Sequence, residues 1–495
     1  MRKSAVAIIA AVAVIVLLPN LPGGRVPSED AGVFFYAARA LLAGGLPYRD
    51  VWDHKSPLIY AIDALGLLIA GPLGVWLLQL AALVITGLLA RRALRPWFGR
   101  VPAAFGAIAL LLATPRLFLE DGVQTSFVEL FALPLQLAAF AIVAARPELR
   151  IERRAAVSLG VLAALAILLK PTLVGTWLAI VLVVIWRERR AAVAPLSAMG
   201  AGGGAVLVLV AVYFAARGAL GDLVEQAIRY NLAYTSFAPL GERLGAIPEG
   251  LRLVSVSGLA PLAIAAAAYA AWRRVVPPIV VVALVALPIE MLLATSGRAY
   301  HYYFLPWLPA MAVLASYAAC ETMRALGAQR AVAVIAVAAV LMSVQPARLV
   351  ARLAALRDDG MARSAAAFVT ARTTPDDMVL VWGADAEILV LTERRSPTRY
   401  VYQYAALATR GYATPAAVDS LLADLVARPP RLIIDTSATT FVTPPLDRAG
   451  FRAWTSPEAQ YAWPAETERI IAFVEANYVR EGTIPGTSWP AWRRR

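Results

Sequence analysis

The sequence has one cysteine, two histidines and few charged residues for its length. Among 495 residues, 16% are Asp, Glu, Lys or Arg, whereas soluble domains carry about 25%. The single cysteine, Cys320, excludes an intrachain disulfide. The chain has no Cys/His spacing for zinc, no phosphate-binding P-loop and no Gly-x-Gly-x-x-Gly motif after a strand. These absences argue against most nucleotide-driven pumps.

What the sequence does have is apolar surface. Hydrophobic residues make up 60% of the chain, and the mean hydropathy is +0.67, whereas soluble proteins are about 45–50% apolar. The net charge of +13 comes from basic residues that sit in short clusters between apolar runs. That pattern is typical of cytoplasmic membrane loops. We therefore expect an integral membrane protein that does not bind nucleic acid.

About eleven apolar segments predict membrane-spanning helices, each of which needs about 20 apolar residues. The first segment is interpreted as an uncleaved anchor with a cytoplasmic N-terminus, because no A-x-A cleavage site follows it. The predicted spans are Ser4–Leu21, Ile62–Ala90, Pro102–Thr114, Ser126–Ala145, Ala155–Leu169, Thr172–Trp186, Ala192–Ala215, Leu251–Ala271, Pro277–Ala294, Tyr302–Cys320 and Ala331–Val344.

The basic clusters between these spans predict the orientation of the chain. Each cluster falls on the side that an alternating chain places in the cytoplasm, as the positive-inside rule requires. With an odd number of spans, the part after Val344 lies outside the cell membrane. The clusters begin at Arg91, Arg146, Arg187, Arg273 and Arg324.

Residues 346–495 are more polar and predict a second, extracytoplasmic domain after the membrane domain of residues 1–345. Met378–Trp382 and Arg431–Asp435 are short apolar runs typical of buried strands. Asp385–Leu391, Pro415–Ala427 and Ile470–Tyr478 are typical of helices. Because strands and helices alternate, we expect a small α/β domain.

The densest polar stretch lies in the first predicted outer loop, residues 22–61. It contains the acidic pair Glu29 and Asp30, and later Lys55. Charges at a membrane boundary are costly unless they have partners or a function. The later outer loops and the start of one span add further charged candidates, namely Glu120, Asp121, Glu129, Arg298 and His301.

Carboxylates and cations at one membrane face suit group transfer from a phosphate. A carboxylate can remove a proton from an attacking hydroxyl, and cations can hold the phosphate and stabilise the leaving group.

Each of these residues has a structural alternative that spacing alone leaves open. Asp30 can cap the helix Ala31–Ala43, and the Lys55 ammonium can reach the lipid headgroups. Arg298 and His301 can be interfacial anchors beside tyrosines. Glu129 lies within an apolar span, where a carboxylate needs a partner. Lys170-Pro171 marks a tight outer turn, although that lysine can also reach a phosphate.

These motifs resemble the polyprenyl-phosphate-sugar-dependent membrane glycosyltransferases with the GT-C fold. That superfamily includes protein O-mannosyltransferases, aminoarabinose transferases and the bacterial RgtA/B/C/D-like group. The resemblance covers roughly the first 345 residues. Its motifs are the acidic pair after the first span, G-x-P-Y-x-D at Gly45–Asp50, a K-P-P-L-type element at Lys55–Leu58 with Ser56 in place of the first proline, and an R-x-x-H-Y-Y-like loop at Arg298–Tyr303.

The resemblance implies transfer of a sugar from polyprenyl phosphate, with inversion, to a glycan, lipid or protein acceptor at the outer face of the cytoplasmic membrane. It implies that Asp30 is the general base, with Glu29 as the second choice. Lys55 would contact the lipid phosphate. The resemblance further implies assistance from Arg298 and His301, and binding of the acceptor, or of a divalent cation (Mg²⁺ or Mn²⁺) where a member uses one, by Glu120, Asp121 or Glu129.

Two other classes of function compete with this hypothesis. A transporter or lipid flippase for an envelope precursor usually shows internal repeats and ionisable groups near mid-membrane. Here no repeat is evident, and Glu129 is the strongest mid-span candidate. A non-catalytic assembly or receptor protein would leave the acid–lysine arrangement of the first loop unused. We therefore favour the transferase.

Overall fold

The membrane part of the chain is a bundle of helices. The computed structural model describes residues 2–118, 124, 126–146, 148, 150–237, 239–273, 275–294, 298–356 and 360–495. Each of the eleven predicted spans overlaps a helix of this bundle. These helices are α1 (Arg2–Leu17), α4 (Pro72–Phe98), α5 (Arg100–Ala113), α7 (Val128–Ala144), α8 (Arg153–Leu169), α9 (Gly175–Glu188), α10 (Val193–Ala216), α14 (Leu259–Trp272), α15 (Pro278–Ala294), α16 (Leu308–Leu326) and α17 (Ala328–Ala355).

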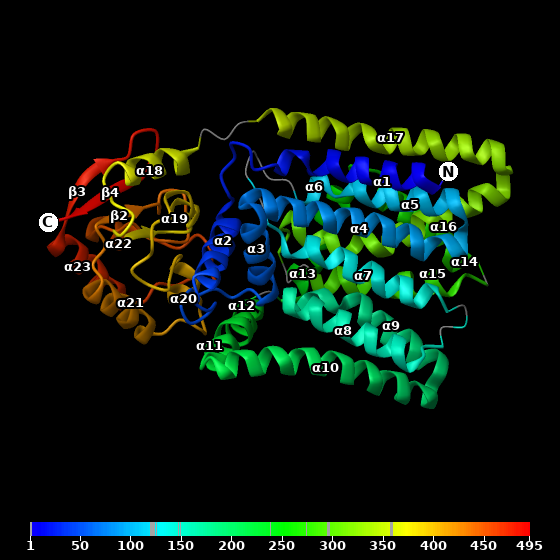
Figure 1. Cartoon of the computed structure of the whole chain (residues 1–495), viewed down its shortest axis with the longest axis horizontal. Helices are drawn as coiled ribbons and strands as arrows, with labels where there is room; N and C mark the ends of the chain where they lie inside the picture. Colours follow the sequence, from blue (N-terminus) through cyan, green and yellow to red (C-terminus); the bar gives the residue numbers. More distant parts are fainter. Residues whose placement is uncertain are drawn as a thin grey trace.

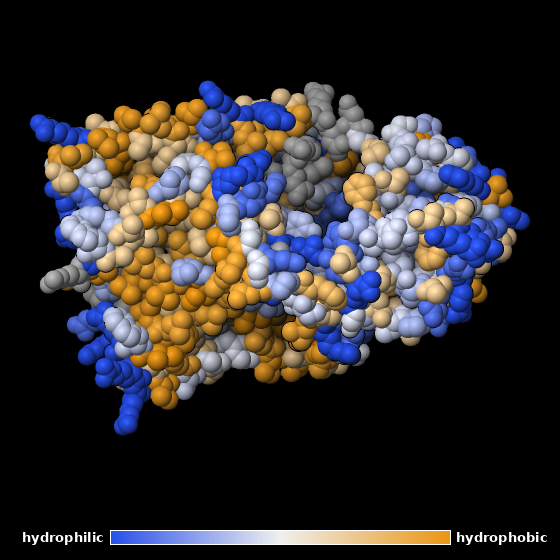
Figure 2. All heavy atoms as spheres, turned by 180° about the vertical axis from the view of Figure 1, so that it is seen from behind, coloured by the Kyte–Doolittle hydropathy of each residue, from blue (hydrophilic) through white to orange (hydrophobic). Residues whose placement is uncertain are grey.

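The surface of the bundle is that of a membrane protein. Within the described residues, five helices are long and apolar enough to cross a bilayer, or six if the bent pair α13 (Leu240–Ser255) and α14 forms one span. Figure 2 shows a broad apolar belt across the face of the bundle in view, with a polar rim at one end and the polar C-terminal part at the other. An exposed apolar band of this kind suits a hydrocarbon environment.

Two segments differ from the simple pattern of spans and loops. The predicted span Ile62–Ala90 contains two helices, α3 (Leu58–Ala70) and α4, which meet in a turn at Gly71 with φ of +60°. The sequence left this open, because Ala61–Trp76 can include a helix along the membrane surface before the second span proper. A side chain at Gly66 would come within 2.7 Å of the Val75 backbone, so glycine permits this close approach. Residues 217–250, which connect two predicted spans, are mostly helical: α11 (Leu220–Val224), the π-helical turn η4 (Glu225–Tyr230), α12 (Asn231–Ser236) and the start of α13.

The C-terminal part contains a four-stranded mixed sheet of order β1-β2-β4-β3. The two predicted strands are confirmed as β1 (Val379–Trp382) and β2 (Leu432–Asp435), which pair in parallel. Strands β3 (Tyr478–Thr483) and β4 (Pro490–Arg494) form an antiparallel hairpin. This hairpin was not predicted, because β3 is exposed beyond Tyr478 and lacks an apolar pattern.

Helices cover this sheet and join it to the bundle. The predicted helices of the C-terminal part are confirmed as α19 (Glu387–Thr392), α21 (Pro415–Ala427) and α23 (Glu468–Asn477). Three further helices are α18 (Met361–Thr370), α20 (Tyr404–Ala408) and α22 (Arg448–Ala453). Figure 1 shows α2 (Glu29–Leu42) where the bundle meets this C-terminal part.

Helix α2 is fixed to the C-terminal part by a close backbone contact. A Cβ atom at Gly32 of α2 would lie 2.5 Å from the backbone nitrogen of Glu387, at the start of α19. Further along α2, an Arg39 guanidinium nitrogen donates to the carbonyl of Val390 over 2.9 Å. Helix α2, whose first turn carries Glu29 and Asp30, is therefore held against the C-terminal part.

Replacement of Gly32 by alanine should loosen this contact. Because the added methyl group meets backbone, the two helices must move apart, and we expect a loss of about 1–3 kcal/mol of stability. Thermal unfolding of the detergent-solubilised protein would measure this loss. Gly204→Ala on α10 is the matched control, because a Cβ there meets no atom within 4 Å. Equal midpoints for the two variants would contradict the packing described here.

Candidate active site

The first turn of α2 presents Asp30 at the junction between the bundle and the C-terminal part. The helix is capped by Ser28, whose hydroxyl accepts a hydrogen bond from the backbone N–H of Ala31 over 3.3 Å. The suggestion that Asp30 caps the helix is therefore wrong. The segment before α2 pairs with Gln124, since the Ser28 N–H donates to the Gln124 carbonyl over 2.8 Å. The helix cap therefore does not use the Asp30 carboxylate.

The loop between α2 and α3 positions Lys55 through its own hydrogen bonds. Tyr48 adopts a φ of +72°, and its hydroxyl donates to the Lys55 carbonyl over 2.8 Å. The Asp50 carboxylate accepts from the backbone N–H of Leu46 over 2.7 Å and closes the turn. The Asn231 amide from α12 donates to the His54 carbonyl over 2.7 Å. The G-x-P-Y-x-D motif thus builds the turn that presents Lys55.

Asp30 and Lys55 form a loose ion pair, with 3.8 Å between Lys55 Nζ and Asp30 Oδ2. The Asp30 side chain is 44% exposed, whereas that of Lys55 is 17% exposed. The Tyr302 hydroxyl donates to the same Asp30 oxygen over 3.4 Å. Burial by itself lowers the pKa of Lys55, but the nearby Asp30 carboxylate helps to raise it above its usual value. Lys55 is therefore a permanent cation beside an accessible carboxylate.

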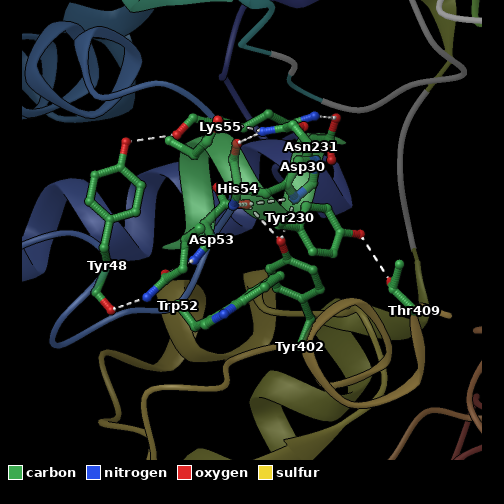
Figure 3. Close-up of polar contacts among 12 residues, drawn as sticks. Asp30, Tyr48, Trp52, Asp53, His54, Lys55, Tyr230, Asn231, Tyr402 and Thr409 are labelled. Atoms are coloured by element: carbon green, nitrogen blue, oxygen red, sulfur yellow. Dashed lines mark hydrogen bonds and ion pairs between the residues drawn. The ribbon is translucent and has the colours of Figure 1, made fainter. Parts of the chain in front are cut away.

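Asp53, two residues before Lys55, is a carboxylate of a different kind (Figure 3). It is 2% exposed and accepts from the hydroxyls of Tyr402 over 2.6 Å and Tyr60 over 2.7 Å, and from the His54 N–H over 2.7 Å. Burial raises its pKa, but His54, Lys55 and Tyr402 together lower it to about 2. A carboxylate so well satisfied is a weak base. Its role is to hold the loop and Tyr402 of the C-terminal part.

A second acid–lysine pair lies beside the first. Lys170, at the end of α8, contacts Glu129 of α7 with 2.7 Å between Nζ and Oε1. The Lys170 ammonium also sits 3.4 Å from the ring centre of Tyr303. This gives Glu129 the partner that a carboxylate in an apolar span needs. The sequence contains three lysines in all, and two of them occupy this small region.

Two cavities adjoin these residues. One, of about 250 Å³, is lined by Lys55, Lys170, Tyr234 and Tyr303, together with apolar side chains of α8 and α12. The other, of about 30 Å³, is lined by Glu29, Asp30, Asp53 and His54 from the first loop and α2, and by Ala384, Tyr402 and Tyr404 from the C-terminal part. The two members of the ion pair therefore line different cavities. Lys55 lines the larger cavity together with Lys170, and Asp30 lines the smaller cavity together with Glu29 and Asp53.

The remaining predicted residues lie around this centre. Arg298 forms an ion pair with Glu458 of the C-terminal part over 3.1 Å, and its guanidinium lies 5.2 Å from the ring centre of Tyr234, which lines the larger cavity. His301 is exposed at the start of the helical turn η5 (His301–Trp307). Glu120 and Asp121 lie outside the described residues. No group of three or more His, Cys, Asp or Glu suited to a metal occurs among the described residues.

Two contributions were not anticipated from the sequence. Tyr402 comes from the C-terminal part, 348 residues after His54, and its hydroxyl lies 3.1 Å from the His54 Nδ1 atom. Nothing in the linear sequence signals such a contact. Glu458, the partner of Arg298, was missed for the same reason.

Comparison with known proteins places the chain in a family. The family model described as the N-terminal domain of the competence-induced protein Ccs4 matches residues 28–340. The chain belongs to this Ccs4 family. No curated protein matches it.

Solved structures share the fold of this Ccs4-family chain. ArnT from Cupriavidus metallidurans bound to undecaprenyl phosphate is 15% identical, with a TM-score of 0.59, over 89% of this chain and 94% of that chain. An Archaeoglobus fulgidus oligosaccharyltransferase in complex with zinc and sulfate is 14% identical, with a TM-score of 0.56, over 87% of this chain and 67% of that chain. The archaeal oligosaccharyltransferase AglB from Archaeoglobus fulgidus, in complex with an inhibitory peptide and a dolichol-phosphate, is 11% identical, with a TM-score of 0.54, over 100% of this chain and 74% of that chain. These likenesses confirm the expected GT-C fold.

The hydroxyl of Tyr402 should matter for the stability of the Ccs4-family chain. Tyr402→Phe removes a donor from the buried Asp53 carboxylate, and such a loss costs about 1–3 kcal/mol. We expect a lower thermal midpoint in detergent. Tyr404→Phe is the matched control, because the Tyr404 hydroxyl makes no hydrogen bond within the part of the chain that the structure describes. The Tyr404 ring, which this change keeps, contacts Tyr402 and Tyr461. A midpoint drop of the same size in both variants would count against the Asp53–Tyr402 bond.

Proposed function

We propose that the chain is a membrane glycosyltransferase that moves a sugar from a polyprenyl-phosphate donor to an acceptor hydroxyl, with inversion. The observation that carries this proposal is the half-exposed Asp30 paired with Lys55 beside a cavity that a second lysine also lines. The shared fold with ArnT bound to undecaprenyl phosphate and with AglB bound to a dolichol-phosphate supports it.

Lys55 and Lys170 are the proposed donor-phosphate ligands. Both line the larger cavity, whose remaining wall includes apolar side chains such as Leu169 and Leu232. That combination suits a phosphate attached to an apolar chain. An ammonium is a compact point charge, which can follow the phosphate as its bond to the sugar lengthens. Arg298, which stacks over Tyr234 of the same cavity, is proposed to assist once its pair with Glu458 opens.

Asp30 is the proposed general base because it is the accessible carboxylate beside the cations. It would accept the proton of the acceptor hydroxyl, whose oxygen then attacks the anomeric carbon of the sugar. The bond between that carbon and the phosphate oxygen breaks, and the polyprenyl phosphate leaves with its negative charge stabilised by Lys55. Attack and departure on opposite faces of the sugar invert the anomeric centre.

The acceptor is proposed to enter from the side of the C-terminal part, residues 346–495. The smaller cavity there combines Glu29 and Asp30 with Tyr402 and Tyr404. The arginine-rich turns lie at the opposite end of the bundle, which supports a proposed orientation by the positive-inside rule. In this orientation the C-terminal part lies outside the cell membrane and the N-terminus lies in the cytoplasm. Glu120 and Asp121 stay candidates for contact with the acceptor or a divalent cation.

Asp30→Asn should reduce sugar transfer by about 10²–10⁴-fold, the usual contribution of a general base. In cells that carry this variant in place of the wild type, one polyprenyl-phosphate sugar should accumulate, as measured by mass spectrometry of extracted lipids.

Asp376→Asn, an exposed position of the C-terminal part, is the expression control for this experiment. If Glu29→Gln blocks transfer and Asp30→Asn does not, the base is Glu29. If no lipid-linked sugar changes at normal protein levels, the transferase proposal fails.

Lys55→Met should weaken binding of added undecaprenyl phosphate about tenfold or more, because a hydrogen bond to a charged group is worth about 1.5–3 kcal/mol. Native mass spectrometry of the purified protein would measure the bound fraction. The double variant Glu129→Gln/Lys170→Met should show a similar loss without leaving a buried charge unpaired. Arg252→Met, an exposed cation paired with Glu249, is the matched control. If neither lysine variant changes the binding of undecaprenyl phosphate, the result favours the alternative in which the Lys55 ammonium reaches the membrane lipid headgroups.

A further inference from the structure

Four arginines gather at the end of the bundle that lies farthest from the C-terminal part. Arg91, Arg92 and Arg95 lie on the last turns of α4, and Arg100 opens α5. A tight turn at Gly99, with φ of +85°, joins the two helices. Figure 1 shows the α16–α17 turn and the N-terminus at this same end. Figure 2 shows a hydrophilic rim there, next to the apolar belt.

These arginines lie apart from the carboxylates that the structure describes. Among the described residues, none of the four takes part in an ion pair. The Nε atom of Arg91 is buried and lacks a hydrogen-bond partner within the described part of the chain. A buried donor without a partner is unfavourable. An anionic group at Arg91 would therefore satisfy both its charge and its buried N–H.

A cavity extends from these arginines into the apolar belt. Its volume is about 360 Å³, and Arg91, Arg95 and Arg100 line its polar end. Its walls are apolar side chains of α1, α5 and α17, among them Phe105, Ile108, Ile335 and Ala339. The α5 residues on the wall, Val101 to Ile108, cover two helical turns, about 10 Å. The cavity therefore runs along the helices, as a lipid chain in a bilayer does.

A second cavity adjoins the same end of α4, next to α7. It measures about 580 Å³ and shares Arg91 and Arg95 with the first, while Leu88 and Ala141 contribute to its apolar lining. Two cavities therefore adjoin the basic end of α4, and arginines and apolar side chains line both of them. Inorganic phosphate would satisfy the arginines but leave the apolar walls in contact with water. A lipid with a charged phosphate covers both kinds of surface.

We propose that this end of the bundle binds an anionic phospholipid of the inner leaflet. Its phosphate lies on Arg91, Arg95 and Arg100, and an acyl chain fills the groove between α5 and α17. Basic pockets between membrane helices on the cytoplasmic side recognise such headgroups. This site is separate from the proposed transferase centre, because the 27 residues of α4 span about 40 Å. It does not depend on the proposed sugar transfer.

Native mass spectrometry of the detergent-solubilised full chain with added phosphatidylglycerol tests this site. Wild type is compared with the triple variant Arg91→Gln/Arg95→Gln/Arg100→Gln. At about 1 kcal/mol for each basic residue near an anionic lipid, retention should fall about a hundredfold. Arg187→Gln/Arg189→Gln/Arg190→Gln removes the same charge from exposed positions at the end of α9. This control should retain the lipid as wild type does.

Ala104→Phe provides a second variant that leaves every charge in place. Ala104 lines the first cavity, and the larger side chain should reduce phosphatidylglycerol retention by filling the space for the acyl chain. Equal retention in wild type and the triple variant would overturn the proposal, and so would an equal loss in both arginine variants. Competition by glycerol phosphate at the same concentration would also overturn it, because it would show a site for free phosphate.

Discussion

The ion pair between Asp30 and Lys55 is the interaction on which the rest of the site depends. It joins the first turn of α2 to the loop before α3, over 3.8 Å. Its geometry is fixed from both sides. Ser28 caps α2 and pairs with Gln124, and the Tyr48 hydroxyl holds the Lys55 carbonyl. Asp30 and Lys55 are therefore held at a fixed separation, while Asp30 stays open to solvent. The proposed transfer needs both features, because its base must remove a proton beside the departing phosphate.

Three carboxylates in this region differ through their surroundings alone. Asp30 is half-exposed with one loose cation. Asp53 is buried under three donors, so it is ionised but weakly basic. Glu129 is committed to Lys170 at 2.7 Å. Solvent access and the number of hydrogen-bond donors therefore give the three carboxylates different roles. Asp30 is the proposed base, Asp53 orders the loop, and Glu129 holds Lys170 in an apolar span.

The sequence predicted the parts of the fold that rest on local signals. Apolar length found the bundle helices, and the apolar runs found β1 and β2. The separation of α3 from α4 was anticipated only as an alternative, a surface helix within Ala61–Trp76. The exact turn at Gly71 was not predicted, because it depends on one positive φ angle. In the proposed site, the motif singled out Asp30 and Lys55, which the fold brings together. Tyr402 and Glu458 reach this region from the far end of the chain. Such contacts arise only from tertiary packing.

The most direct test of this account is a cryo-electron microscopy structure of the chain with undecaprenyl phosphate, at a resolution that shows the headgroup. The account predicts phosphate density in the cavity that Lys55 and Lys170 share, within hydrogen-bond reach of both ammonium groups and beside Asp30. Headgroup density confined to the arginine-lined cavities at the other end of α4, with none near the two lysines, would contradict the assignment of this centre to a lipid-linked donor.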